Sequence, residues 1–153
     1  MKSSSLKAHM NAAKGYAKLS HAKRLKVGAV LVKDDRIISI GYNGTPSGQD
    51  NNCEEAVPHL NMLDQVTTID YVTKPDVVHA EMNVIAFAAK YGVSTDKCSL
   101  VITDSPCFEC CKLIIQSGIK EVFYGKEYRD RSGLKFLHDN NIFTSGITEI
   151  NGE

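Results

Sequence analysis

The sequence predicts an α/β protein with three layers, helix–sheet–helix, around a central mixed sheet of about five strands. Residues 27–32 form an almost continuous run of apolar, largely β-branched residues, and a second such run follows the polar stretch 33–36. In the second half of the chain, strand-like segments alternate with helix-like ones, which is typical of a sheet covered by helices on both faces. We therefore expect one domain over residues 1–153.

The first half contains a helix, a hairpin and a loop. Apolar residues recur at helical spacing over residues 5–19, which predicts the first helix. The two apolar runs, 27–32 and 37–42, predict a hairpin over residues 26–42. Residues 41–52 (GYNGTPSGQDNN) are dense in Gly, Asn and Pro, so we expect a loop that allows close approach of the backbone to a ligand.

The second half is more regular, although residues 53–78 carry a weak pattern. We interpret residues 60–72 as holding a short helix. After them, helices over 80–92 and 107–118 each end at a glycine, the usual C-terminal residue. We further expect strands at 98–103, 121–125 and 147–150 and a helix at 134–141.

Composition excludes several classes of protein. Lys plus Arg and Asp plus Glu number 18 each, so the formal net charge is zero, which argues against a broad basic surface for nucleic acid. No apolar run approaches the roughly 20 residues of a membrane span, and residues 1–16 hold no apolar stretch of signal-peptide length. Five cysteines, mostly clustered, do not resemble a secreted disulfide framework. We therefore expect a cytoplasmic protein that binds neither nucleic acid nor membrane.

Two short fragments, His79-Ala80-Glu81 and Pro106-Cys107-Phe108-Glu109-Cys110, indicate a metal site. Side chains at the opening of a helix lean toward its N-terminal end, so ligands at two helix openings can converge. We expect Pro106 to be the first helical residue, capped by Ser105. A redox Cys-x-x-Cys pair is the alternative, but it leaves His79 and Glu81 unexplained. Helical spacing alone does not decide whether Cys110 or Cys111 joins Cys107.

With three protein ligands of mixed N and S type, the fourth position of a tetrahedral zinc ion stays open, which is the catalytic pattern. Glu81 is then free to act as a general base. A closed structural zinc site or ordinary core packing is the alternative interpretation of the same residues.

The two fragments match the H-x-E and P-C-x-x-C signature of the zinc nucleobase deaminases. Over nearly its full length the chain resembles the deoxycytidylate (dCMP) deaminases, in residues 26–48, 79–85, 103–124 and 128–142. The resemblance implies a cytidine-deaminase-like fold, Zn²⁺ held by His79, Cys107 and Cys110, Glu81 as the catalytic residue, and Cys111 as a packing residue. It also implies hydrolysis of dCMP to dUMP.

The resemblance further implies residues for the nucleotide. Arg24, Lys26, Asn43 and Tyr124 are the expected substrate contacts, with residues 128–131 as weaker candidates. A solvated surface is the alternative for the basic cluster at 23–26. The family is commonly a homohexamer activated by dCTP and inhibited by dTTP, with Mg²⁺ on the triphosphate. For this allosteric site we expect Asn43, Gly44, Thr45 and Gly48.

Several alternatives stay open from the sequence. The chain could deaminate a free nucleoside or a tRNA base, or it could be a zinc-stabilised binding module without turnover. Some relatives carry a second, structural zinc, for which the available residues here are Cys53, His59 and Cys98. We expect Cys98 in the core instead, and His9, His21 and His138 at the surface.

Overall fold

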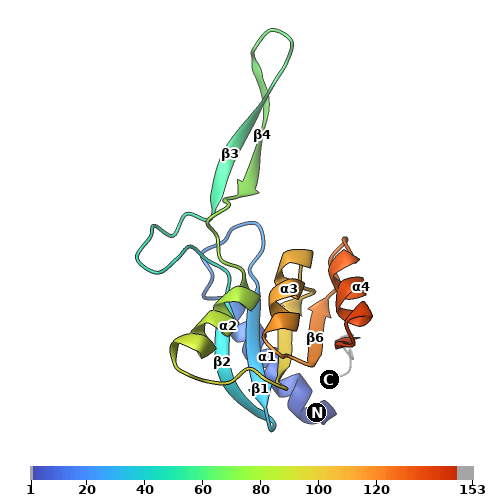
Figure 1. Ribbon diagram of the computed structural model, residues 1–153. Coiled ribbons are helices and arrows are strands. Elements are labelled where there is room, and N and C mark those ends of the chain that lie inside the picture. The colour runs from blue at the N-terminus through green and yellow to red at the C-terminus, as the bar shows by residue number, and fades with distance from the viewer. Residues whose placement is uncertain (1, 148–153) are drawn as a thin grey trace.

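The structure is a computed structural model that describes residues 2–147, and it has the expected three layers (Figure 1). The main sheet has five strands in the order β2-β1-β5-β6-β7. Their bounds are Gly28–Lys33 (β1), Arg36–Tyr42 (β2), Ser99–Asp104 (β5), Glu121–Lys126 (β6) and Phe143–Gly146 (β7). β1 is antiparallel to both neighbours, whereas β5, β6 and β7 are parallel. The prediction of a mixed five-stranded sheet is therefore confirmed.

The first two strands form the expected hairpin. Asp34 and Asp35, which connect them, both have positive φ, at 48° and 62°. Aspartate tolerates this left-handed conformation better than most residues, and two such residues suit a tight two-residue turn. The register shifts once, between Leu31 and Val32, because of a bulge.

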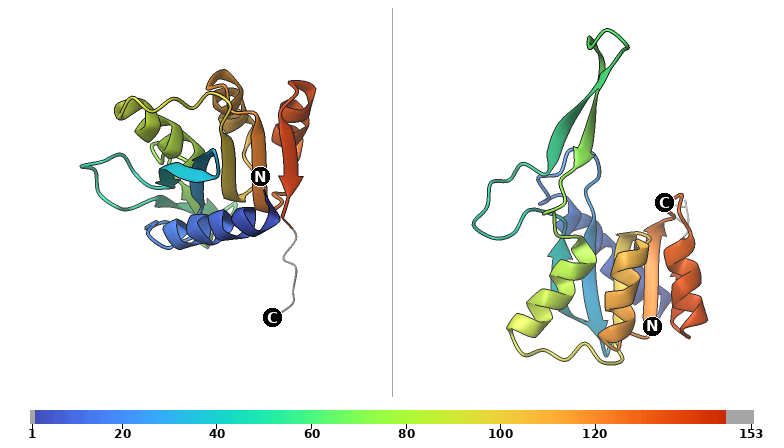
Figure 2. Two further views of the ribbon diagram at one scale, coloured as in Figure 1. Left: turned by 90° about the horizontal axis from the view of Figure 1, so that it is seen from below. Right: turned by 45° about the horizontal axis from the view of Figure 1, so that its top comes forward.

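One face of the sheet is covered by helix α1, Ser3–Ala17 (Figure 2). Met10 and Ala13 of α1 pack on Val30, Val101 and Phe123 of three neighbouring strands. The helix lies so close to β1 that a Cβ atom on Gly28 would sit 2.1 Å from the carbonyl oxygen of Ala13. A residue without a side chain is therefore required at this crossing.

The opposite face carries α2 (Ala80–Lys90), α3 (Phe108–Gln116) and α4 (Ser132–Asp139), and it holds the larger part of the core. Fully buried side chains from α2, β5 and α3 meet there, among them Val84, Leu100 and Ile114. Gly92 and Gly118, which follow α2 and α3, have φ of +68° and +80°. This confirms that glycines end both helices.

Strands β3 (Glu54–Leu60) and β4 (Val66–Thr73) form a separate two-stranded hairpin that projects from the body (Figure 1). The predicted short helix over 60–72 is therefore wrong. Its polar residues lie in the turn, where the Asn61 side chain accepts hydrogen bonds from the backbone N–H groups of Leu63 and Gln65. The β-branched residues after the turn favour a strand.

Other boundaries also differ from the prediction. The last strand is Phe143–Gly146, so most of the predicted 147–150 strand lies outside the described residues. The first and last helices begin and end two residues earlier than expected. No helix within residues 2–147 combines the length and the hydropathy that crossing a membrane requires.

Candidate metal centre

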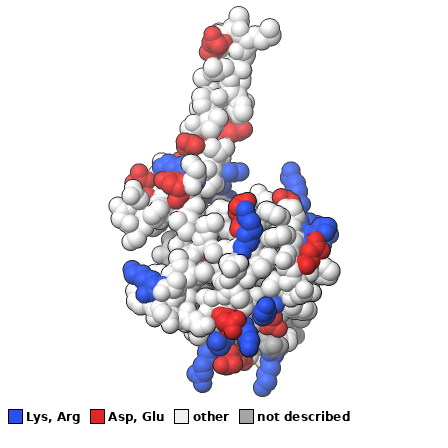
Figure 3. All heavy atoms as spheres, viewed as in Figure 1, with Lys and Arg blue, Asp and Glu red and all other residues white. Residues whose placement is uncertain are grey.

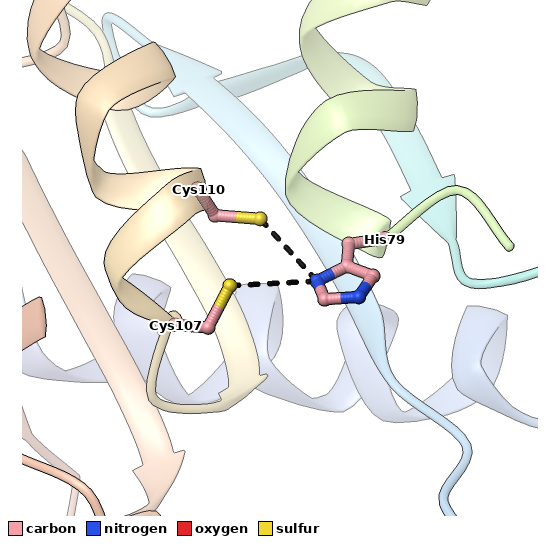
Figure 4. Close-up of side chains that lie close together, drawn as sticks. All are labelled: His79, Cys107 and Cys110. Atoms are coloured by element: carbon pink, nitrogen blue, oxygen red, sulfur yellow. Dashed lines mark hydrogen bonds between the residues drawn. The ribbon is translucent and has the colours of Figure 1, made fainter. Parts of the chain in front are cut away.

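Two helix openings face each other and bring three side chains together (Figure 4). His79 is the N-cap of α2 and Cys107 is the N-cap of α3, while Cys110 lies in the first turn of α3. Both caps have extended backbones, with ψ of 156° and 164°, so their side chains point ahead of the helices. This convergence explains how ligands from two distant parts of the chain meet.

The cap of α3 differs from the prediction. The helix begins at Phe108, so Pro106 is not its first residue and Ser105 is not its N-cap. The hydroxyl of Ser105 instead accepts a hydrogen bond from the backbone N–H of Tyr128, at 2.8 Å. Ser105 therefore fixes the loop that follows β6, while Cys107 itself takes the cap position.

The three side chains fit a tetrahedral zinc ion. The Nδ1 atom of His79 lies 3.6 Å from the Sγ of Cys107 and 3.4 Å from the Sγ of Cys110. Zinc–sulfur bonds of about 2.3 Å and zinc–nitrogen bonds of about 2.0 Å at tetrahedral angles place N and S roughly 3.5 Å apart. Among the described residues this is the one group of His, Cys, Asp and Glu side chains with such spacing.

The thiols differ in their electrostatics, and the difference favours a ligand role for Cys107. A hydrogen bond from the Cys110 thiol, together with His79, lowers the pKa of Cys107 to about 4. The pKa of Cys110 is raised because its thiol donates to Cys107. Zinc binds cysteine as the thiolate and displaces the proton of the thiol. A site that already stabilises one negatively charged sulfur therefore favours the binding of zinc.

Cys111 points elsewhere. It is fully buried in the core beside α4, and its thiol lies 3.9 Å from the carbonyl oxygen of Pro106. Burial raises the pKa of this thiol to about 12, so it stays protonated. A Cβ atom on Gly133 of α4 would lie 3.0 Å from the same sulfur. Cys111 is thus a packing residue, as expected.

Glu81 lies in the first turn of α2, two residues after His79, and only 4% of its surface is exposed. Burial raises the pKa of its carboxyl to about 7, against a reference value of 4.5. A carboxyl group with a pKa near neutrality can both accept and donate a proton at physiological pH. This is the property that an acid–base catalyst needs.

The loop after β2 is tied to the segment that carries His79. Gly44 and Val78 exchange two backbone hydrogen bonds, of 3.1 and 2.8 Å, directly before the histidine. The side-chain amide of Asn83, one turn into α2, donates to the carbonyl oxygen of Tyr42 at 2.6 Å. Sequence reasoning missed Asn83, whose only signal was a polar residue on a helix that is otherwise largely apolar.

Asn43 holds a second loop. Its side chain accepts a hydrogen bond from the N–H of Val27 and donates to the carbonyl oxygen of Leu25, both at 2.8 Å. The neighbouring Arg24 and Lys26 are exposed. Asn43 therefore shapes the basic loop that holds the two expected cationic contacts.

The remaining predicted residues lie in different surroundings. Tyr124 is 9% exposed, and its hydroxyl donates to Glu127 at 3.3 Å. Thr45 donates to the carbonyl oxygen of Asp50 within its own loop. Gly48 has a φ of +89°, and neither Gly44 nor Gly48 has an atom near the position of a Cβ. Both glycines thus leave open space beside the backbone.

The candidates for a second zinc do not meet. Cys53 is buried beside Ala22 and Val77, His59 pairs with Asp70 on the projecting hairpin, and Cys98 is in the main core. His9, expected at the surface, is only 8% exposed because α1 packs it toward Asp35. The expectation that His9 is exposed was wrong, because it rested on the polarity of the side chain and not on its place on the buried face of α1.

Comparison with known proteins matches residues 3–126 to the family described as the cytidine and deoxycytidylate deaminase zinc-binding region. The chain belongs to this family. It is 37% identical to the deoxycytidylate deaminase of Enterobacteria phage T4 over 155 residues, covering 82% of this chain and 78% of the relative. The resemblance inferred from the motifs is thereby confirmed, and so is zinc as the metal of the family's site.

The fold is confirmed by a solved structure. The dCMP deaminase of cyanophage S-TIM5, in complex with dCMP and dUMP, matches with a TM-score of 0.83 at 36% identity and covers 96% of this chain and 99% of that one. ComE operon protein 2 of Bacillus subtilis is 41% identical over 110 residues, and the chain spans 53% of its length. The human deoxycytidylate deaminase is likewise matched over 56% of its length.

Proposed function

We propose that the protein catalyses the hydrolytic deamination of dCMP to dUMP. The observation that carries the proposal is the cluster of His79, Cys107 and Cys110 at two facing helix openings, beside the buried Glu81. Relatives named for this activity support the choice of reaction. Such an enzyme is a hydrolase that acts on the C–N bond of a cyclic amidine.

His79 Nδ1 and the sulfurs of Cys107 and Cys110 hold the zinc ion in this proposal. Zinc supplies Lewis acidity, which brings the pKa of a bound water toward about 7. The protein contributes three ligands and leaves room for one more, in contrast to a structural site closed by four. Two helix N-termini also direct their positive ends at this point, which favours anionic groups there.

Glu81 carries the protons. Its carboxylate accepts a proton from the attacking water and transfers it to the ring nitrogen beside the carbon under attack. The same carboxylate next takes the proton of the hydroxyl group now bound to that carbon and passes it to the exocyclic amine, so that the C–N bond breaks, a carbonyl forms and ammonia leaves. Since one group serves as base and then as acid, a pKa near 7 suits both steps.

The nucleotide lies, in this proposal, against the loops that Asn43 joins. Arg24 and Lys26 supply the cationic groups that a 5′-phosphate requires, and Asn43 holds their loop through its bonds to residues 25 and 27. Tyr124 contacts the nucleotide from β6, with residues 128–131 near the phosphate.

Regulation follows the pattern of the family. We infer activation by dCTP and inhibition by dTTP, each with Mg²⁺, at a pocket that includes Asn43, Gly44, Thr45 and Gly48. The open space beside the two glycines supports this place for a triphosphate. We also infer a homohexamer in the cytoplasm, where the five free cysteines stay reduced.

Ammonia release tests the proposal. Purified zinc-loaded protein is incubated with dCMP, CMP, deoxycytidine and a tRNA anticodon stem-loop, each with and without dCTP and Mg²⁺. We expect dCMP to be the preferred substrate and dCTP to raise its rate. Turnover of deoxycytidine as fast as dCMP would refute phosphate recognition, and turnover of the stem-loop alone would replace the substrate. No turnover of any substrate would favour a binding module.

A further inference from the structure

The β3–β4 hairpin makes no appreciable contact with any other helix or strand in residues 2–147, and it extends into solvent in Figure 1 and in the right view of Figure 2. A two-stranded ribbon alone is at best marginally stable in water, because it has no sheet face or helix to pack on. The hairpin nevertheless keeps a regular register over six residue pairs, and a seventh pair, Leu60 with Val66, follows one shift of the register. Some other surface must therefore support it.

The register divides the hairpin into two unlike faces. Residues that pair across the strands point to the same side, and neighbours along a strand alternate. One side is apolar beyond the pair of Glu54 and Thr73 at its foot, and it is called here the apolar face: Ala56, Pro58, Leu60, Val66, Ile69 and Tyr71. The other side is mostly polar: beside Val57 and Val72 it carries Glu55, Thr68 and the ion pair of His59 with Asp70, at 2.9 Å.

The apolar face is exposed. Leu60, Ile69 and Tyr71 expose 55%, 54% and 60% of their surface, and Met62 and Leu63 at the tip expose 102% and 76%. Together they present an exposed apolar surface of a kind that monomeric proteins rarely leave uncovered. The pattern is that of an interface, because the exposed apolar side chains are concentrated on one face, whereas the other face exposes Val57 alone among mostly polar residues.

Charge indicates which partner fits. Residues 53–73 contain four acidic residues and no Lys or Arg. The rest of the chain therefore holds all 18 basic residues against 18 minus 4, or 14, acidic ones. Figure 3 shows red and no blue on the projecting part of the hairpin, whereas the body carries both blue and red. An acidic, apolar arm and a basic body in one sequence are complementary between two copies.

A basic and apolar surface lies at the foot of the same hairpin, in residues 18–26. Leu19 and Leu25 expose 53% and 41% of their surface, and Lys23 and Arg24 are exposed between them. The carboxylate of Glu54, the first residue of β3, accepts hydrogen bonds from the backbone N–H groups of Lys23 and Arg24, at 2.8 and 3.1 Å. This loop is therefore fixed to the foot of the hairpin.

We propose that a second copy of this chain covers the apolar face. The two hairpins pack antiparallel, apolar face to apolar face, around a two-fold axis, and the tip of each reaches the 18–26 loop of the other copy. Seven residues of strand span roughly 23 Å, so full overlap brings tip and foot together. Met62, Leu63 and Asp64 then meet Leu25 and its basic neighbours, and the contact is the same from both sides.

The arrangement has a consequence that rests on the proposed function. Arg24 and Lys26 belong to the loop that the partner's tip covers, so each copy would help to order the phosphate contacts of the other. Loss of the interface should then raise KM for dCMP without removing zinc, since no zinc ligand lies in the hairpin or the loop.

The test compares two adjacent residues on opposite faces of β4. Ile69→Glu places a charge on the apolar face, and Thr68→Glu places the same charge on the polar face beside it; both positions are exposed. Sedimentation velocity over a range of concentrations, without substrate, gives the mass of each. We expect Thr68→Glu to assemble like the wild type and Ile69→Glu to weaken association at least about 100-fold, because two charges are buried per interface.

A shortened variant, with residues 58–69 replaced by Asn-Gly, gives a second measurement that does not depend on a point substitution. We expect it to fold, to bind one zinc per chain, and to have the mass of Ile69→Glu. A monomeric wild type, or equal masses for the wild type and both Ile69→Glu and the shortened variant, would overturn the proposal. Failure of the proposed function appears separately, as absent turnover in a correctly assembled wild type.

Discussion

Replacing Glu81 by Gln should stabilise the metal-free protein at neutral pH while abolishing its turnover. The carboxyl group is 4% exposed, and its pKa is about 7 in the folded state against 4.5 as the reference. Between these two values the folded protein holds a proton that the unfolded chain releases. The free energy of unfolding therefore falls as pH rises through this window, and the loss is complete above pH 7.

The magnitude follows from the shift. A difference of 2.5 pKa units at 1.36 kcal/mol each is about 3 kcal/mol of stability lost between pH 4.5 and pH 8. Glutamine has no proton to lose, so the Glu81→Gln variant escapes this loss. The difference in unfolding free energy between variant and wild type should therefore grow by about 3 kcal/mol over that range.

Urea denaturation in the presence of a chelator and a reductant measures this difference at each pH. Glu109→Gln removes an exposed carboxylate near the same site and serves as the control, with no comparable change expected. If the unfolding free energies of Glu81→Gln and the wild type changed with pH in parallel, the pKa of Glu81 would not be raised in the folded protein. That result would refute the prediction. With zinc bound the difference should shrink, because the cation favours the carboxylate. The loaded variant should keep its zinc and lose at least about 1000-fold in kcat.

Four further substitutions probe the site. Cys111→Ala should retain one zinc per chain, whereas Cys110→Ala should lose it, as measured by metal analysis after dialysis. The reverse result would make Cys111 the ligand and Cys110 the packing residue. Arg24→Ala should raise KM for dCMP at least about tenfold and leave deoxycytidine turnover unchanged, and equal effects on both substrates would remove Arg24 from phosphate binding. Asn83→Ala frees the carbonyl oxygen of Tyr42 and should cost about 1 kcal/mol of stability and raise KM more than it lowers kcat; an unchanged KM would mean that the loop holds its position without this bond.

Sequence alone predicted the layers and the three clustered side chains because both depend on local signals. The apolar runs and terminal glycines mark strands and helix ends directly. The metal cluster was predicted from His-x-Glu and Pro-Cys-x-x-Cys, two short fragments at helix openings that match a known metal-binding signature. The position of Cys111 also followed, since the signature selects Cys110 and leaves its neighbour to the core.

The hairpin could not be predicted in the same way. A strand pair that packs on the body alternates apolar and polar residues clearly, whereas residues 60–72 mix apolar side chains with a polar turn. The Asx-type turn at Asn61 and the left-handed Asp64, with φ of 56°, decide the chain reversal there. Burial of His9 was missed for a related reason, because the partner that accommodates it, Asp35, lies on the turn between β1 and β2.

The opening of α2 positions the proposed metal ligand, the proposed base and the proposed substrate loop together. Val78 exchanges two backbone hydrogen bonds with Gly44, and the next residue is His79. Four residues after His79, Asn83 holds the carbonyl of Tyr42 on the other side of the same loop. The loop that carries Asn43 is therefore hydrogen-bonded to residues on both sides of the histidine in the sequence, Val78 before it and Asn83 after it. Because Asn43 in turn fixes residues 25 and 27, the basic loop is positioned by the same helix opening that positions the zinc ligand. A shift in the histidine would be passed to the loop of Arg24 and Lys26 through only two layers of hydrogen bonds, and under the proposed function this would give the phosphate and the base of the nucleotide a fixed relative position.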